Sequence, residues 1–83
     1  METICRVCGM EYDSATWNSD NDATFDICNC CGVEFGNEDS TMKGVEEYRE
    51  DWIRKGAPWF APEQKPKNWN LEEQLKKIPS RWL

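Results

Sequence analysis

Residues 5–12 read CRVCGMEY and residues 28–35 read CNCCGVEF. Both segments follow one pattern, in which two cysteines three positions apart precede glycine, an apolar residue, glutamate and an aromatic residue. Nineteen residues separate Cys8 from Cys28, and the two halves of four-cysteine zinc sites are usually about 15 to 20 residues apart. The repeat therefore predicts two zinc knuckles that face each other and share one ion.

The predicted metal ligands are Cys5, Cys8, Cys28 and Cys31, which would hold one structural zinc ion per chain. In each knuckle the glycine after the second cysteine allows the positive φ that turns backbone N–H groups toward the thiolates. Cys30 competes for the fourth position. Only Cys31 keeps the two-residue gap and precedes a glycine, so we expect Cys30 to be a packed structural residue.

The size of the chain indicates that its fold needs support beyond a hydrophobic core. It has 83 residues, and a domain of this length is marginal without a metal, disulfides or a partner. No apolar run is long enough to span a bilayer, and the first residues lack the pattern of a secretory signal. We therefore expect a cytoplasmic protein, with no membrane association, in which five reduced cysteines serve metal binding.

Charge is distributed unevenly along the chain. Residues 1–53 carry thirteen acidic and three basic residues, whereas residues 54–83 carry seven basic and three acidic ones. The net charge is −6. An acidic surface of this kind repels phosphates and attracts basic partners.

The segment between the knuckles predicts a hairpin-like ribbon. Residues 13–22 are polar and rich in turn formers, and residues 23–27 alternate as a short strand does. Acidic residues in this segment suggest a calcium loop, but the glycine and distal glutamate of an EF-hand are missing. We expect a solvated tip that carries an exposed Trp17.

Two helices are predicted after the second knuckle. The longer helix covers residues 42–55, with Ser40 or Thr41 as its N-cap, Gly56 as its stop and an apolar stripe of Val45, Tyr48, Trp52 and Ile53. Prolines at 58, 62 and 66 then predict an ordered, extended wrap that packs Trp59 and Phe60. A short second helix follows Asn70, which is its predicted N-cap, and presents Leu71, Leu75 and Ile78.

The expected fold class is a small α+β zinc-stabilised domain. Zinc-ribbon-like β hairpins carry the two knuckles, and one longer and one short C-terminal helix follow them. We expect a single domain over residues 1–83, with a zinc ribbon at 1–44 and a helical tail at 45–83 packed on the ribbon.

The chain resembles the small bacterial cysteine-rich proteins known for a Cys-Pro-Cys-Cys-Gly motif. The residues that carry the resemblance are the two knuckles, Glu34-Phe35-Gly36, Glu47-Tyr48-Arg49, Trp52-Ile53, Trp59-Phe60, Trp69 and Glu73-Gln74-Leu75. Arg6 and Asn29 stand where that family usually has proline. The resemblance implies a zinc-ribbon-like fold, a bacterial origin and an accessory or toxin-neutralising role.

The composition argues against an enzyme. Four thiolates close a zinc site that would need an open position for catalysis, and the chain has no histidine to act as a general base. The five tryptophans divide into an expected core set of Trp52, Trp59 and Trp69 and two expected surface residues, Trp17 and Trp82.

The predicted function is therefore non-enzymatic protein binding. The partner would be a protein with a basic surface, for example a nuclease toxin neutralised by an immunity-type protein. The predicted contact residues are Trp17, Glu46, Glu47 and Glu50, although charges on the outer face of a helix are often only solvated. The alternative is a zinc ribbon whose basic tail contacts nucleic acid or the transcription machinery, and a thiol oxidoreductase ranks third. The sequence sets neither the partner nor the oligomeric state.

Overall fold

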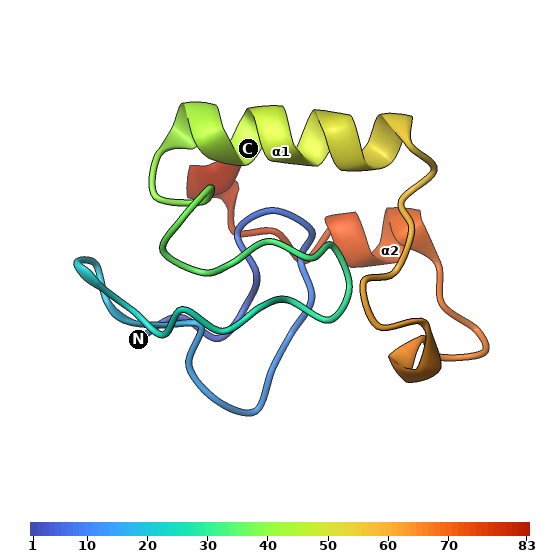
Figure 1. The fold of residues 1–83 in the computed structure, drawn as a ribbon, viewed down its shortest axis with the longest axis horizontal. Helices are drawn as coiled ribbons and strands as arrows, with labels where there is room; N and C mark the ends of the chain where they lie inside the picture. Colours follow the sequence, from blue (N-terminus) through green and yellow to red (C-terminus); the bar gives the residue numbers. More distant parts are fainter.

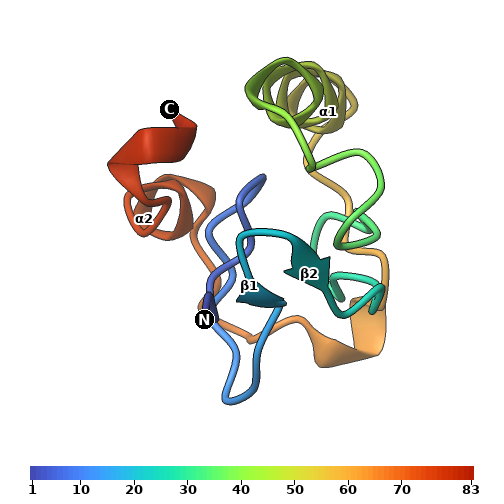
Figure 2. The same cartoon turned by 90° about the vertical axis from the view of Figure 1, so that its left-hand side faces the viewer.

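Most of the N-terminal half is irregular loop in the computed structural model, which describes residues 1–83 throughout. The regular elements are β1 (Trp17–Ser19), β2 (Asp22–Ala23), α1 (Met42–Arg54), α2 (Leu71–Leu75) and two single-turn 3-10 helices, η1 (Pro62–Gln64) and η2 (Ser80–Trp82). Helix α1 lies across the loops that carry the cysteines, and α2 lies beside them (Figure 1). The first knuckle lies between α1 and α2 (Figure 2). The structure confirms a small α+β fold.

The hairpin is shorter than predicted. β1 and β2 pair antiparallel through Trp17 and Ala23, but the expected strand over residues 23–27 is wrong beyond Ala23. Phe25 adopts a positive φ of 64° and donates its backbone N–H to the carbonyl of Phe35. The chain therefore leaves the hairpin to pair with the second knuckle, and Phe25 and Ile27 remain exposed.

Helix α1 begins and ends at predicted signals. The Thr41 hydroxyl accepts a hydrogen bond from the Gly44 backbone N–H at 3.0 Å, so Thr41, and not Ser40, is the N-cap. At the other end, Gly56 has a φ of 97°, a left-handed conformation that glycine adopts without strain. The helix ends at Arg54, one residue earlier than predicted.

Three of the four apolar residues predicted to pack on the inner face of α1 do so. Val45 and Trp52 are buried as expected, and Tyr48 packs against the core. Ile53 is exposed instead, because Arg49 occupies the inner face and donates hydrogen bonds to three backbone carbonyls. The packed side of the helix is therefore centred between Tyr48 and Arg49, which leaves Ile53 at its edge.

The proline-rich segment is ordered, as predicted. The backbone N–H groups of Phe60 and Ala61 donate to the carbonyls of Cys30 and Asn29, both at 2.9 Å. These bonds fix the segment on the second knuckle. The side chain of Phe60 nevertheless points outward and is 59% exposed, so the expectation that it packs is wrong.

Asn70 caps α2 as predicted, since its side chain accepts from the Glu73 backbone N–H at 2.9 Å. Ile78 is buried after this helix, and Leu71 and Leu75 are partly buried against the core. The C-terminal segment then ends in η2, which places Trp82 near the first knuckle.

Four of the five tryptophans are buried. Trp52 and Trp59 lie in the core as expected, and Trp69 is partly buried against it. The expectation that Trp17 and Trp82 are exposed is wrong, because they retain only 6% and 8% of their exposure. The physical reason is the Arg6 guanidinium, which lies between the two rings, 3.8 Å from the Trp17 centroid and 4.0 Å from the Trp82 centroid.

One continuous core joins these parts. It contains all five cysteines together with apolar residues from the knuckles, the hairpin, α1 and the C-terminal segment. No helix of the structure combines the length and apolarity needed to cross a bilayer.

Candidate metal centre

The two repeats form the same backbone turn. In the first, Cys5 N–H donates to the Met10 carbonyl at 2.8 Å and Gly9 N–H to the Cys5 carbonyl at 3.0 Å. In the second, Cys28 N–H donates to the Val33 carbonyl at 2.8 Å, and Gly32 N–H to the Cys28 carbonyl at 2.9 Å. The two glycines have nearly equal φ values of 85° and 83°. The repeated sequence therefore gives a repeated turn that a side chain at either glycine would strain.

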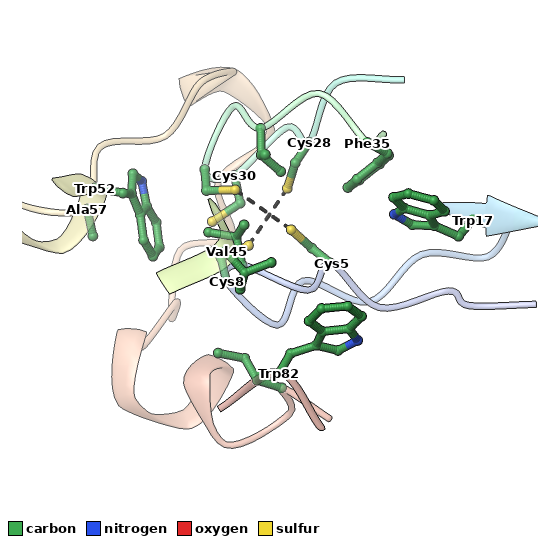
Figure 3. Close-up of a cluster of buried hydrophobic side chains, with 14 of the residues drawn as sticks. Cys5, Cys8, Trp17, Cys28, Cys30, Phe35, Val45, Trp52, Ala57 and Trp82 are labelled. Carbon is green, nitrogen blue, oxygen red and sulfur yellow. Dashed lines mark hydrogen bonds between the residues drawn. The ribbon is translucent and has the colours of Figure 1, made fainter. Parts of the chain in front are cut away.

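The turns bring four sulfur atoms together. The Sγ atoms of Cys5, Cys8, Cys28 and Cys31 all lie within 4.8 Å of one another. Cys5 lies 3.7 Å from Cys31, and Cys8 lies 3.7 Å from Cys28. A tetrahedral zinc site with Zn–S bonds of about 2.3 Å has sulfur–sulfur edges of about 3.8 Å. All four cysteines belong to the buried core, and Figure 3 shows the side chains of Cys5, Cys8 and Cys28 pointing toward one another within it.

Burial and hydrogen bonding within the cluster shift the pKa values of its thiols in opposite directions. Burial raises the pKa of the Cys8 and Cys31 thiols. The pKa of Cys28 lies far below its usual range, because hydrogen bonds from Cys31, Cys5 and Cys8 stabilise its thiolate. Buried thiolates repel one another, and a divalent cation among them removes that repulsion. The donor set, its spacing and its burial therefore fit one metal ion with four sulfur ligands.

Tyr12, the aromatic residue that ends the first repeat, supports the cluster. Its hydroxyl donates to Cys28 Sγ at 3.1 Å and accepts from the Asn29 backbone N–H at 2.9 Å. Its ring packs edge-on against Phe35, the aromatic residue that ends the second repeat, with centroids 6.0 Å apart. Tyr12 and Phe35 occupy the same position in the two repeats, and this match could have predicted that their rings are in contact.

Cys30 is buried and lies outside the group of four clustered sulfurs. Its thiol accepts a hydrogen bond from Gln74 Nε2 at 3.2 Å, and the same amide lies 3.2 Å from the Cys8 carbonyl. Gln74, which comes from α2, therefore links both knuckles. Nothing in the local sequence distinguishes this glutamine from a solvent-facing helix residue.

The tyrosines give a prediction about alkaline titration. Burial raises the pKa of Tyr48 to about 12, and it raises the pKa of Tyr12 above its usual range. Because the folded pKa of Tyr48 is raised, its contribution to stability is complete below the unfolded pKa of about 10 and is lost as the pH rises toward 12.

We expect the ultraviolet absorbance of the folded protein at pH 10 to show almost no tyrosinate, whereas the same protein in denaturant is about half ionised. Tyr48→Phe should remove the rise near pH 12. A folded protein that ionises one tyrosine near pH 10 would contradict the observed burial.

Two arginines outside the cluster hold the first knuckle in place. Arg6 is 2% exposed and donates two hydrogen bonds to the Glu2 carboxylate, at 2.8 and 2.6 Å, and a third to the Asp39 carbonyl at 2.9 Å. Arg49 donates to the carbonyls of Val7, Arg6 and Trp82, each at 2.7 Å. These contacts join α1 and the C-terminus to the metal site.

The structure separates the predicted partner-binding residues. Glu46, Glu47 and Glu50 are exposed on α1, and none of them forms an ion pair. Trp17 is buried and donates its indole N–H to Asp39 at 3.1 Å. With 6% of its surface exposed, Trp17 offers too little contact area to anchor a partner.

The fold and the site define a small cysteine-rich α+β protein in which four clustered thiols lie close enough to hold one metal ion. The chain is 30% identical, over 78 aligned residues, to a protein of Bacillus subtilis (strain 168) described as "Uncharacterized protein YoaQ". The alignment covers 75% of this chain and 66% of YoaQ, just under two thirds of the relative's length. Neither a family model nor a solved structure matches the chain. The resemblance to the Cys-Pro-Cys-Cys-Gly proteins therefore stays a prediction.

Proposed function

We propose that the protein is a non-enzymatic protein-binding module with a zinc-ribbon-like fold, stabilised by one structural zinc. The observation that carries this proposal is the burial of the thiol cluster. Cys5, Cys8 and Cys28 are fully buried and Cys31 is 6% exposed. Such a set of four sulfurs leaves a metal neither an open coordination position nor a route to substrate, whereas catalytic zinc sites keep one position open. The protein would then act through contacts made by its surface residues.

The outer face of α1 is the surface best suited to binding. Glu46, Glu47 and Glu50 are exposed without ion-pair partners, whereas Asp51 on the same helix pairs with Lys55 at 2.8 Å and with Arg54. Unpaired carboxylates project a negative field into solvent, and that field accelerates association with a positively charged protein. We define the acidic face by these three glutamates.

The partner that fits this surface is a basic protein. A nuclease toxin is one such protein, because an inhibitor that presents carboxylates where phosphates bind would neutralise it. The net charge of −6 supports this assignment, and so does the resemblance to accessory and toxin-neutralising proteins. All five cysteines are free, which suits a cytoplasmic location in a bacterial cell.

The alternative, a contact with nucleic acid or the transcription machinery, would use the basic residues of the C-terminal half. Several of these already have partners within the chain. Lys76 lies 3.4 Å from Glu73, Arg81 lies 3.9 Å from Asp20, and Lys65 lies over the Trp69 ring. This pairing weakens their field toward phosphates, so we rank this function second.

The test uses charge reversal on the acidic face. The wild type and the double variant Glu46→Lys/Glu50→Lys serve as baits for host proteins, and association kinetics are then measured with the isolated partner. We expect the association rate constant to fall about tenfold at low salt, with a smaller change in dissociation, because steering acts before contact. The difference should shrink as salt shortens the Debye length.

The matched control is Asp22→Lys/Asp26→Lys, which changes the net charge equally at two exposed positions of the hairpin and the loop that follows it. It should affect association much less. If binding is indifferent to the α1 reversals but is lost when Lys65, Lys67, Lys76 and Lys77 are neutralised, the nucleic-acid function replaces the proposed one.

A further inference from the structure

The largest hollow on the molecule lies between the first knuckle and α2. It has a volume of about 540 Å³ and is lined by residues from Gly9 to Asp13 on one side and from Pro66 to Lys77 on the other. We call it the knuckle–α2 hollow. None of its lining residues belongs to the acidic face of α1.

Hydrogen bonds tie the walls of the hollow to the two cysteine knuckles. Tyr12 is tied to Cys28 by its hydroxyl, and Trp69 donates its indole N–H to Gln74 at 2.7 Å. Gln74 is in turn tied to Cys30 and to the Cys8 carbonyl. The aromatic walls therefore keep their positions without a ligand, which lowers the entropic cost of binding one.

Two lining residues of the hollow, Gly9 and Gln74, are in close contact. A Cβ atom at Gly9 would lie only 2.3 Å from the Gln74 carbonyl oxygen, so the knuckle approaches α2 more closely than any other residue would permit. Gly9 is thus required for this contact as well as for the turn. The contact between Gly9 and Gln74 therefore sets the distance between the first knuckle and α2.

The charge of the lining is negative. Glu11, Asp13 and Glu73 contribute carboxylates, and Lys77 contributes one cation. Glu11 and Asp13 form no ion pair within the chain, whereas Glu73 forms an ion pair with Lys76 at 3.4 Å. Carboxylates at the rim of a hollow with tyrosine and tryptophan walls are the chemistry that recognises a cation.

The ring of Trp69 already accepts a cation from the chain itself. The Lys65 ammonium lies 5.2 Å from its centroid, and the ring packs nearly perpendicular to that of Trp59, with centroids 5.6 Å apart. A guanidinium fits such a site best, because it is planar, stacks on aromatic rings and donates two parallel hydrogen bonds to a carboxylate.

We propose that the knuckle–α2 hollow binds an arginine side chain of a basic protein partner. The proposal rests on the proposed function for the nature of the partner. It adds a second contact, distinct from the acidic face, at which one residue of the partner is recognised by shape and charge together.

The test uses the metal-loaded full chain and two small molecules, N-acetyl-arginine methylamide and its neutral isostere N-acetyl-citrulline methylamide. Binding is followed by amide and indole resonances in two-dimensional NMR. We expect the arginine derivative to shift the Trp69 indole and the amides of residues 9–13. It should bind about tenfold more tightly than the citrulline derivative at low salt, because the carboxylates attract the charged guanidinium and not the neutral group that replaces it.

The variant Glu11→Gln/Asp13→Asn should abolish this preference without loss of the fold, since both residues are exposed. The matched control Asp22→Asn/Asp26→Asn removes the same charge elsewhere and should keep it. Equal affinity for the two derivatives, or shifts that avoid the hollow, would overturn the proposal.

These outcomes separate the inference from the function on which it rests. Selective arginine binding in the hollow, combined with a partner that ignores the reversals on α1, would contradict only the acidic-face function. A partner that responds to those reversals, combined with no selective arginine binding, would contradict only the hollow.

Discussion

Serine in place of any one of the four clustered cysteines is expected to leave the chain unfolded and metal-free. The thiols of Cys5, Cys8, Cys28 and Cys31 lie at the centre of the core, so the energy of metal binding is also folding energy. That energy is about 10–16 kcal/mol for structural zinc in small domains at neutral pH. The whole stability of a typical domain is about 5–15 kcal/mol, so an incomplete site cannot support the fold.

Circular dichroism and native mass spectrometry measure the result. The wild type should carry one zinc ion, and each of these variants should show loss of helical signal together with loss of the ion. Since four tetrahedral sulfurs also suit iron, a wild type that purifies with one iron ion would contradict the zinc assignment while leaving the ligands unchanged.

Cys30→Ser is the matched control. It changes one buried sulfur that is outside the cluster and loses mainly the hydrogen bond from Gln74. We expect a loss of about 1–2 kcal/mol, with the metal retained. If Cys30→Ser released the metal and Cys31→Ser kept it, the ligand assignment would be reversed.

The second large effect is expected for Arg6→Ala. This change removes a buried guanidinium from between Trp17 and Trp82 and leaves the Glu2 carboxylate, whose side chain is 21% exposed, without its cation. Removing one partner of a fully buried ion pair costs about 3–5 kcal/mol, since the other charge is left uncompensated. Glu2 is partly exposed and also lies near Arg81 and the N-terminus, so the expected loss is about 3 kcal/mol. The two indole rings also lose their stacking contacts.

Urea unfolding of the metal-loaded protein measures this loss, with the metal content held constant. Arg54→Ala is the control, because Arg54 also pairs with an acid one turn away but is exposed, and it should change stability little. Arg6→Lys should recover only part of the loss, since an ammonium cannot stack or pair through two bonds as a guanidinium does. A stability for Arg6→Ala equal to that of Arg54→Ala would show that the stack carries no energy.

Local patterns in the chain were sufficient for several features. The duplicated Cys-x-x-Cys-Gly segment predicted both turns and the four clustered thiols, because each turn depends on residues only a few positions apart. Thr41, Gly56 and Asn70 marked helix ends for the same reason, since a cap acts on backbone groups within one turn.

Contacts between distant segments decided the rest. Nothing near Trp17 indicates that Arg6 covers its ring, nor that Trp82 closes the stack from the other end of the chain. The expected exposure of both tryptophans was wrong because the fold brings together three positions that are separated in sequence. Likewise, no local pattern places Arg49 on the inner face of α1, yet it donates hydrogen bonds to carbonyls of the first knuckle and of Trp82.

Features that could be predicted from the sequence depend on residues a few positions apart, whereas the others depend on contacts between distant segments. Turns and caps act between close neighbours in sequence, and the two cysteine pairs repeat one such turn, so residue spacing was enough to predict which four thiols cluster. The burial of an arginine or the width of the knuckle–α2 hollow depends on which surfaces meet after the chain has folded around the cluster. Gln74 shows the difference, because its identity is unremarkable within α2 and its importance comes only from facing Cys8 and Cys30.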